Sequence, residues 1–204
     1  MDYQKIILVG DVHGKINKLI RYIDDIHFYN EKFQYILLGD VGFKEEYDYL
    51  ISLNISNLKV LFGNHDYYPY LNNNIISLGN YYSFEYNGNK ILCLRGGISM
   101  DKKRRFLNID YFEEEDYDYK LANEILDYCE VYKPDIIISH VLPTSIGYKL
   151  FGYYDNFNIN NTFDEILELY KPKKWICGHY HKSINIVIDD VEYKILNELE
   201  MMIL

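Results

Sequence analysis

Six short apolar runs constrain the fold of this 204-residue chain more than any other feature of its sequence. The runs are KIILV (5–9), YILL (35–38), KVLF (59–62), KILCL (90–94), DIIIS (135–139) and KWIC (174–177). Glycine or polar residues bound each run, and apolar residues occupy consecutive positions within it. Such runs are typical of strands that are buried on both faces. The sequence therefore predicts an α/β protein.

Segments with helical spacing separate several of these runs. Between residues 15 and 29, apolar residues recur at the three- and four-residue intervals of one helix face. The segment 119–132 shows the same spacing. The segment 163–170 follows Asn161 and Thr162, which are favourable N-cap residues. We expect a helix in each of these three places.

Two hairpins are also expected. Residues 75–95 contain two strand-like stretches joined by Asn-Gly-Asn-Lys at 87–90, and an Asn-Gly pair favours the positive φ angles of a tight hairpin turn. The stretches 183–188 and 191–199 are joined by a pair of aspartates in the same way.

The chain is expected to form a single domain over residues 1–204. It contains no linker rich in proline, glycine or serine and no internal repeat. The least regular stretches, 99–118 and 143–161, are expected to be loops or a small cap.

Charge and composition limit the classes of partner. The formal net charge of −10 argues against bulk nonspecific binding to nucleic acid, although a local basic patch stays open. The three cysteines are far apart, which excludes a disulfide framework and predicts buried free thiols. No signal peptide and no bilayer-spanning apolar run is present, so we expect a cytoplasmic protein without a membrane partner. The sequence does not indicate an oligomeric state.

Side chains that can bind metals follow five of the predicted strands. Ligands in open α/β folds bind beyond the carboxyl ends of strands, so these residues should meet at one rim. They are Asp11, His13, Asp40, Asn64, His65, His140, His179 and His181. A lone strand-end aspartate is more often a helix cap, and a lone histidine is more often structural. The whole array favours a metal site.

The chemistry of these residues favours two metal ions. Imidazoles bind borderline cations and carboxylates bind hard ones, so the mixed set suits Mn²⁺ first, with Fe, Zn²⁺, Ni²⁺ and Co²⁺ as alternatives. Even seven of these eight side chains are too many ligands for one ion, whereas two ions about 3.5–4 Å apart can share a carboxylate. Asp40 stands alone after its strand and is the natural bridge.

The ordered motifs of the chain resemble those of the calcineurin-like metallophosphoesterases. The motifs are GDVHG (10–14), GD (39–40), GNHD (63–66), SH (139–140) and GHYH (178–181). The stretch RGGISMDKKRRF (95–106) is similar to a segment of small bacterial and phage members. The resemblance implies a two-sheet β-sandwich flanked by helices, the αββα arrangement of that family.

The resemblance also implies roles for individual residues. Asp11, His13 and His181 would bind one metal ion, Asn64, His140 and His179 the second, and Asp40 both. His65 would protonate or stabilise the leaving alkoxide. Asp66 would orient the His65 ring or cap the following turn.

The implied reaction is hydrolysis of a phosphodiester or phosphomonoester by a metal-bridging hydroxide. A Ser/Thr-type protein phosphatase is one alternative, but those enzymes carry an arginine before GNH where this chain has Phe62. A superfamily DNA nuclease is disfavoured by the acidic charge, and a noncatalytic scaffold by the intact set of ligands.

Two basic features bear on the substrate. Arg95 directly follows the run 90–94 and is a candidate for binding the substrate phosphate bidentately. The four consecutive cations at 102–105 would contact a phosphate or nucleic acid, or form a solvated loop balanced by the acidic stretch 113–116.

Overall fold

Two β-sheets and five α-helices make up the fold in the computed structural model, which describes residues 5–27, 33–152 and 156–204. The first sheet contains β1 (Lys5–Val9), β2 (Phe33–Leu37), β3 (Leu58–Val60) and β10 (Met201–Ile203), in the order β10-β1-β2-β3. The second contains β4 (Tyr81–Tyr86), β5 (Asn89–Leu94), β6 (Ile136–Ser139), β7 (Lys174–Cys177), β8 (Ile184–Ile188) and β9 (Val191–Ile195), in the order β4-β5-β6-β7-β9-β8. The helices are α1 (Ile16–His27), α2 (Lys44–Ser52), α3 (Tyr119–Tyr132), α4 (Thr144–Phe151) and α5 (Asn158–Leu169).

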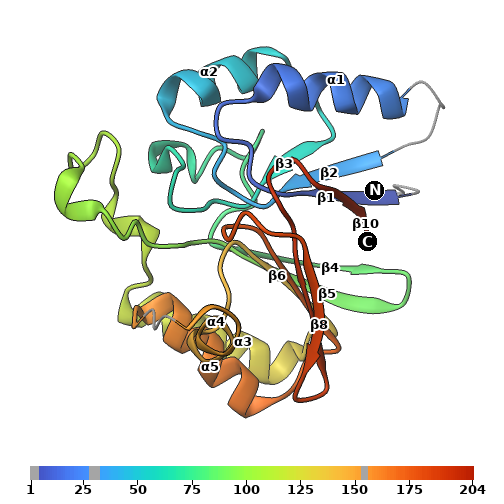
Figure 1. Ribbon diagram of the computed structural model, residues 1–204, viewed down its shortest axis with the longest axis vertical. Coiled ribbons are helices and arrows are strands. Elements are labelled where there is room, and N and C mark those ends of the chain that lie inside the picture. The colour runs from blue at the N-terminus through green and yellow to red at the C-terminus, as the bar shows by residue number, and fades with distance from the viewer. Residues whose placement is uncertain (1–4, 28–32, 153–155) are drawn as a thin grey trace.

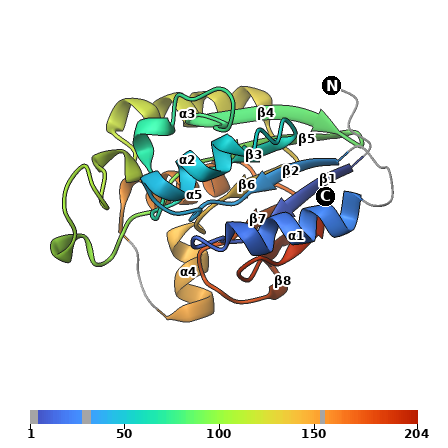
Figure 2. The ribbon, with the colours of Figure 1, turned by 90° about the horizontal axis from the view of Figure 1, so that it is seen from above.

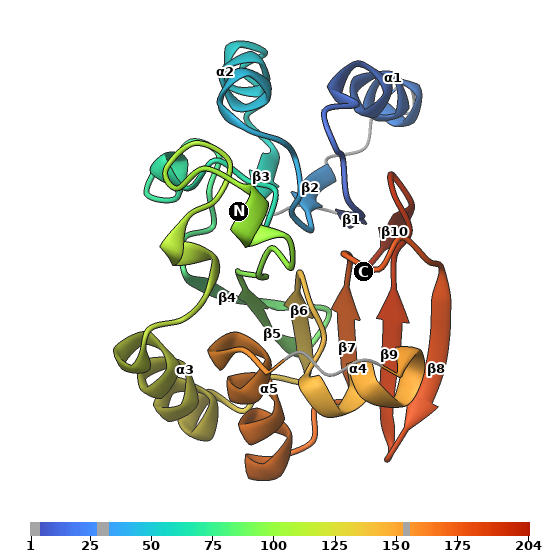
Figure 3. The ribbon, with the colours of Figure 1, turned by 60° about the vertical axis from the view of Figure 1, so that its left-hand side comes forward.

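The sheets lie face to face, with helices on both outer sides. The helices α1 and α2 cover the first sheet, and α3, α4 and α5 cover the second (Figures 1 and 3). Short 3₁₀ turns occur at Tyr68–Tyr70, Lys102–Arg104 and Glu113–Glu115. The predicted two-sheet sandwich flanked by helices is confirmed.

Each central strand divides its side chains between two cores. On β1, Val9 packs toward the helices and Leu8 toward the other sheet. On β7, Trp175 packs toward the helices and Ile176 toward the first sheet. All four are fully buried. Burial of both faces explains why the strands are apolar at consecutive positions.

The two predicted hairpins are confirmed. The turn between β4 and β5 places Asn87 and Gly88 at φ of 50° and 73°. The turn between β8 and β9 places Asp189 and Asp190 at φ of 51° and 70°. Positive φ at both central residues is the geometry that two-residue hairpin turns require.

The helix predicted at 119–132 is confirmed as α3. The helix expected from residue 15 is α1, and residues 28 and 29 of that expectation lie outside the described residues. The prediction for α5 is wrong at its start, because Asn161 and Thr162 lie inside the helix rather than at its cap. The side chain of Asp116, distant in sequence, accepts hydrogen bonds from the backbone N–H groups of Asn158 and Ile159 at 3.3 and 2.9 Å.

Segments without a clear sequence signal account for the other differences. The stretch 143–161, expected to be a loop or cap, contains α4 and the start of α5, while residues 153–155 lie outside the described part. Gly147 weakens the helical pattern there, and Gly152 ends α4 at φ 76°. The helix α2 and the strand β10 were not expected. By contrast, 99–118 is largely irregular, as predicted, and projects from the sheets (lime green in Figures 1 and 2).

Cys93, Cys129 and Cys177 are free and buried, as the composition predicted. Among the described residues, no helix combines the length and the apolar character needed to cross a bilayer.

Candidate metal centre

Every candidate metal ligand comes from a loop that follows the carboxyl end of a strand. Asp11 and His13 follow β1, Asp40 follows β2, Asn64 follows β3, His140 follows β6, and His179 and His181 follow β7. The strands β1 to β3 run parallel to one another, as do β5 to β7. The loops that follow each set therefore leave their sheet at the same edge, where the carboxyl ends of the strands lie. The two facing sheets thereby bring both sets of loops together.

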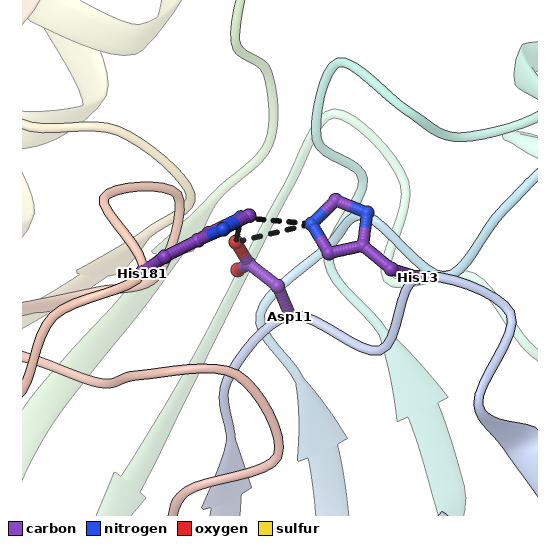
Figure 4. Close-up of side chains that lie close together, drawn as sticks. All are labelled: Asp11, His13 and His181. Carbon is purple, nitrogen blue, oxygen red and sulfur yellow. Dashed lines mark hydrogen bonds and ion pairs between the residues drawn. The ribbon is translucent and has the colours of Figure 1, made fainter.

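Asp11, His13 and His181 form the first group of side chains (Figure 4). The Nε2 atoms of His13 and His181 lie 2.8 Å apart, and Nε2 of His181 lies 3.1 Å from Oδ2 of Asp11. Two ring nitrogens this close need a shared proton or a cation between them. One ligand atom from each residue lies within 4.8 Å of the others, which suits a single metal ion.

Asp40, His140 and His179 form the second group. Nε2 of His140 lies 3.2 Å from Oδ1 of Asp40 and 3.2 Å from Nδ1 of His179. Oδ1 of Asn64 lies 3.1 Å from the same Nε2 atom. Nδ1 of His140 lies 2.7 Å from the Leu38 carbonyl oxygen, and donation to that oxygen directs the Nε2 lone pair into the group.

Asp40 lies between the two groups. Its Oδ2 is 3.8 Å from Nε2 of His13 in the first group. Its Oδ1 is 3.2 Å from Nε2 of His140 in the second. One carboxylate therefore presents a different oxygen to each group.

Four of these residues have a left-handed backbone conformation. The φ angles are 46° at His13, 52° at Asp40, 67° at His179 and 48° at His181. Hydrogen bonds hold the loops in this shape: the His13 N–H donates to the Asp40 carbonyl oxygen at 2.7 Å, and the His179 N–H to Oδ1 of Asp11 at 2.9 Å. Strained backbone of this kind clusters at functional sites.

Burial and neighbouring charge perturb the second group strongly. Burial disfavours protonation of His140, but Asp40 and Asp11 outweigh it and raise its pKa to about 10. Burial and the nearby His140 lower the pKa of His179 to about 4. Burial opposes ionisation of Asp40, yet His140 holds the pKa of that carboxyl well below its usual range. Without a cation, His140 and Asp40 thus form a buried charged pair.

The residues fit divalent cations. Oδ2 of the fully buried Asp11 has only the His181 ring nitrogen, at 3.1 Å, as a possible donor among the described residues. A buried carboxylate oxygen in that state is costly unless a cation compensates it. The imidazole, carboxylate and amide donors match borderline divalent metals such as Mn²⁺ or Zn²⁺.

His65 lies beside the centre but belongs to neither group. Its backbone N–H donates to Oδ1 of Asp40 at 2.8 Å. Its ring packs edge-on against the His13 ring, with centroids 5.5 Å apart. Burial lowers the pKa of the His65 ring. His65 is therefore not a member of either ligand group, although it contacts His13 of the first group and Asp40 of the second.

Asp66 binds loops rather than the His65 ring. Its carboxylate accepts hydrogen bonds from the backbone N–H groups of Asp40 at 2.8 Å, Val41 at 2.7 Å and Gly63 at 2.6 Å. Burial and the neighbouring Asp40 charge raise the pKa of Asp66 to about 7. These partners match neither alternative predicted for Asp66, because they belong neither to the His65 ring nor to the turn that follows Asp66. The Asp66 carboxylate instead joins the loops after β2 and β3.

Arg95 makes its contacts with residues outside the two groups of ligands. The side chain is buried, Nε donates to Oδ1 of Asn80 at 2.8 Å, and Nη1 donates to the Glu114 carbonyl oxygen. The guanidinium carbon lies 5.5 and 5.4 Å from the ring centroids of Tyr68 and Tyr117. These contacts favour a structural role over the phosphate contact expected from the sequence.

The cations at 102–105 differ in their surroundings. Lys102 lies over the ring of Tyr111, 6.0 Å from its centroid. Arg105 instead reaches His65, with Nη2 at 3.1 Å from Nε2 of that ring. The sequence predicts a possible phosphate contact for the run 102–105 as a whole, but no local signal distinguishes Arg105 from its neighbours in that run.

Comparisons with known proteins are consistent with this geometry. A family model described as calcineurin-like phosphoesterase matches residues 4–183. A sequence comparison with curated proteins finds no match.

Several solved structures share the fold. The calcineurin-like phosphoesterase YfkN from Bacillus subtilis is 13% identical with a TM-score of 0.53, and the match covers 96% of this chain and 81% of that one. A putative 5′-nucleotidase from Staphylococcus aureus is 12% identical with a TM-score of 0.51, covering 98% of this chain and 50% of that one. A hypothetical protein from Thermus thermophilus is 14% identical with a TM-score of 0.50, and the match covers 95% of this chain and 75% of that one. At this identity the likeness concerns the fold alone.

Proposed function

This chain belongs to the calcineurin-like phosphoesterase family, and we propose that it hydrolyses phosphate esters with two divalent cations in the centre described above. Membership makes it a metal-dependent phosphate-ester hydrolase. The number of ions, the roles of the residues and the class of ester are our proposal.

The position of Asp40 carries the proposal of two ions. Its two carboxylate oxygens face different groups, toward His13 and toward His140. A carboxylate placed in this way is suited to bind both cations of a pair. The first cation would be held by Asp11, His13 and His181, the second by Asn64, His140 and His179, and both by Asp40.

The surrounding residues would prepare the reaction. Bound divalent cations supply Lewis acidity that activates water and neutralises phosphoryl charge. His65 would donate a proton to the leaving oxygen, since its ring lies against the centre without belonging to a ligand group. Asp66 would hold the loops that carry Asp40 and His65 in position.

Mn²⁺ is the proposed physiological cation. The centre combines nitrogen donors from histidine with oxygen donors from aspartate and asparagine, and no cysteine belongs to either described group. This set suits Mn²⁺, with Fe, Zn²⁺, Ni²⁺ and Co²⁺ as alternatives.

A small phosphodiester or phosphomonoester is the proposed substrate. Phe62 occupies the place where the Ser/Thr phosphatases carry an arginine. The side chain is fully buried and packs against the rings of Tyr47 and Tyr68, with centroids 5.3 and 5.5 Å away. It therefore cannot contact a phosphoprotein, which disfavours the protein-phosphatase alternative. The complete ligand set disfavours a noncatalytic scaffold.

An activity panel tests the proposal. Metal-stripped protein is assayed with Mn²⁺ on p-nitrophenyl phosphate, bis-p-nitrophenyl phosphate, cyclic nucleotides and a phosphopeptide. We expect hydrolysis of at least one small ester and none of the phosphopeptide. Asp40→Asn should lower kcat by at least about 10²-fold, because it removes charge shared by both cations.

A second variant distinguishes a proton-donating role of His65 from a role as a metal ligand. His65→Ala should lower kcat by about 10²-fold or more while binding as much Mn²⁺ as the wild type. Loss of one metal equivalent would make His65 a ligand instead. Wild-type protein inactive on the whole panel, or Asp40→Asn as active as wild type, would refute the enzymatic proposal.

A further inference from the structure

We propose that Arg105 binds the phosphoryl group of the substrate beside His65. This inference rests on the proposed phosphoesterase function and adds a substrate-binding residue to it. It also separates one member of the basic run 102–105 from the others.

The contact between Arg105 and His65 leaves the guanidinium available to a ligand. Nη2 of Arg105 lies 3.1 Å from Nε2 and 3.3 Å from Nδ1 of the His65 ring. The lone-pair positions of the two ring nitrogens point apart, so an amino group this close to both lies against the ring and not along one lone pair. The ring is therefore a poor acceptor for Nη2.

Two other contacts hold the guanidinium in place. Nε donates to Oδ1 of Asp101 at 2.6 Å, and Nη1 donates to the Asp110 carbonyl oxygen at 3.1 Å. A guanidinium has five N–H groups. At least one hydrogen on each Nη atom therefore has no acceptor among the described residues. A phosphoryl group offers two oxygens at the spacing that a guanidinium fork matches.

The position of His65 places this fork near the reacting group. His65 lies between Arg105 and Asp40, whose Oδ1 accepts the His65 backbone N–H. If His65 protonates the leaving oxygen, the phosphoryl group must lie between the metal centre and the His65 ring. A phosphoryl oxygen there would be within reach of Nη2 of Arg105.

The segment that carries Arg105 is anchored to the site. The Ser99 hydroxyl donates to the Asn64 carbonyl oxygen at 3.1 Å, and Oε2 of Glu115 accepts the Ser99 backbone N–H at 2.8 Å. The Arg105 side chain is 10% exposed, so most of its conformational freedom is already lost before a substrate binds. A binding group held in advance in this way contributes more to catalysis than a mobile one.

The test compares Arg105→Ala with Arg104→Ala. Arg104 is exposed and adjacent, and its replacement removes the same charge. We expect Arg105→Ala to lower kcat/KM by about 10²-fold and to weaken the binding of inorganic phosphate, measured by calorimetry with Mn²⁺, by about tenfold. Arg104→Ala should stay within about twofold of wild type in both, because exposed charges are screened by salt.

Chemical rescue tests the role of the fork itself. Guanidinium ion added to Arg105→Ala should restore part of the activity, whereas sodium at equal ionic strength should not. Equal phosphate affinity and equal kcat/KM in Arg105→Ala and Arg104→Ala would overturn the proposal. Absence of guanidinium rescue would also overturn it, provided that Arg105→Ala keeps the wild-type metal content and melting temperature. A wild type that hydrolyses no ester but binds phosphate through Arg105 would refute the proposed function and leave this inference standing.

Discussion

At the scale of single residues, backbone conformation positions the ligands. His13, Asp40, His179 and His181 all have positive φ, which costs about 1–3 kcal/mol at each residue. Closely packed glycines leave room for the side chains: a Cβ atom on Gly63 would lie 2.6 Å from Oδ1 of Asp40. Backbone conformation and close packing at the glycines therefore fix where the ligand side chains lie.

Gly63→Ala is expected to disrupt the metal centre. The added Cβ would also lie 2.6 Å from Nε2 of His140, so at least one ligand has to move. We expect metal content, measured by mass spectrometry after dialysis against Mn²⁺, to fall by about one equivalent, and kcat to fall about 10²-fold.

Gly147→Ala is the matched control. The only atom near a Cβ there, among the described residues, is the Tyr180 hydroxyl oxygen at 3.8 Å. Alanine is favoured over glycine inside a helix by up to about 1 kcal/mol, so this variant should keep its metal and its stability. Equal metal content in the two variants would contradict the prediction.

At the scale of elements, Glu115 organises the connection between β5 and α3. Oε2 accepts the Ser99 N–H at 2.8 Å, and Oε1 accepts the Phe112 N–H at 3.1 Å. Burial of this carboxyl raises its pKa from 4.5 to about 7, although the two N–H groups oppose that shift. The segment that carries Arg105 therefore depends on a carboxyl that titrates in an accessible pH range.

Glu115→Gln is expected to change how stability depends on pH. The folded state binds the Glu115 proton more tightly than the unfolded state, so this group stabilises the fold below about pH 4.5, and the contribution is lost as the pH rises toward 7. The free energy of unfolding of wild type minus that of Glu115→Gln should therefore fall over this range, by up to about 3 kcal/mol.

Urea unfolding from pH 4.5 to 8, in the presence of a chelator, measures this difference. Glu113→Gln, at an exposed neighbouring glutamate, is the control and should show a constant difference from wild type. A Glu115→Gln difference that stays level or rises with pH would show that burial of the carboxyl does not control its titration.

At the scale of the whole molecule, the metal centre joins the two sheets. Asp11 and His13 follow β1 of the first sheet, whereas His181 follows β7 of the second. In the second group Asp40 follows β2 of the first sheet, and His140 follows β6 of the second. A bound cation would therefore hold the sheets together in addition to the apolar core between them.

Mn²⁺ is expected to raise the melting temperature of the chelator-treated protein in a single transition. A ligand at 100 times its Kd stabilises the folded state by about 2.7 kcal/mol. Calorimetry with increasing Mn²⁺ measures the shift. The Mn²⁺-induced rise in melting temperature should be clearly smaller in Asp40→Asn than in the wild type. It should equal the wild-type rise in Asp48→Asn, where the replaced carboxylate is exposed and pairs with Lys44. A melting temperature independent of Mn²⁺ would contradict a cation that joins the sheets.

Local signals explain which parts of the structure could be predicted. Consecutive apolar residues identify strands buried on both faces, and Asn87-Gly88 identifies a hairpin turn, because both depend on neighbouring residues. The start of α5 was misplaced because its cap is Asp116, far away in sequence.

The sequence by itself determined the class of fold and the set of side chains that meet beyond the strand ends. Only the tertiary structure decided how those side chains divide, with the two oxygens of Asp40 facing separate groups. It also decided between two arginines, since Arg95 is buried among Tyr68 and Tyr117 while Arg105 reaches His65. The physical reason is that strands and turns depend on residues close in sequence, whereas a site depends on distances between loops that only packing of the two sheets establishes.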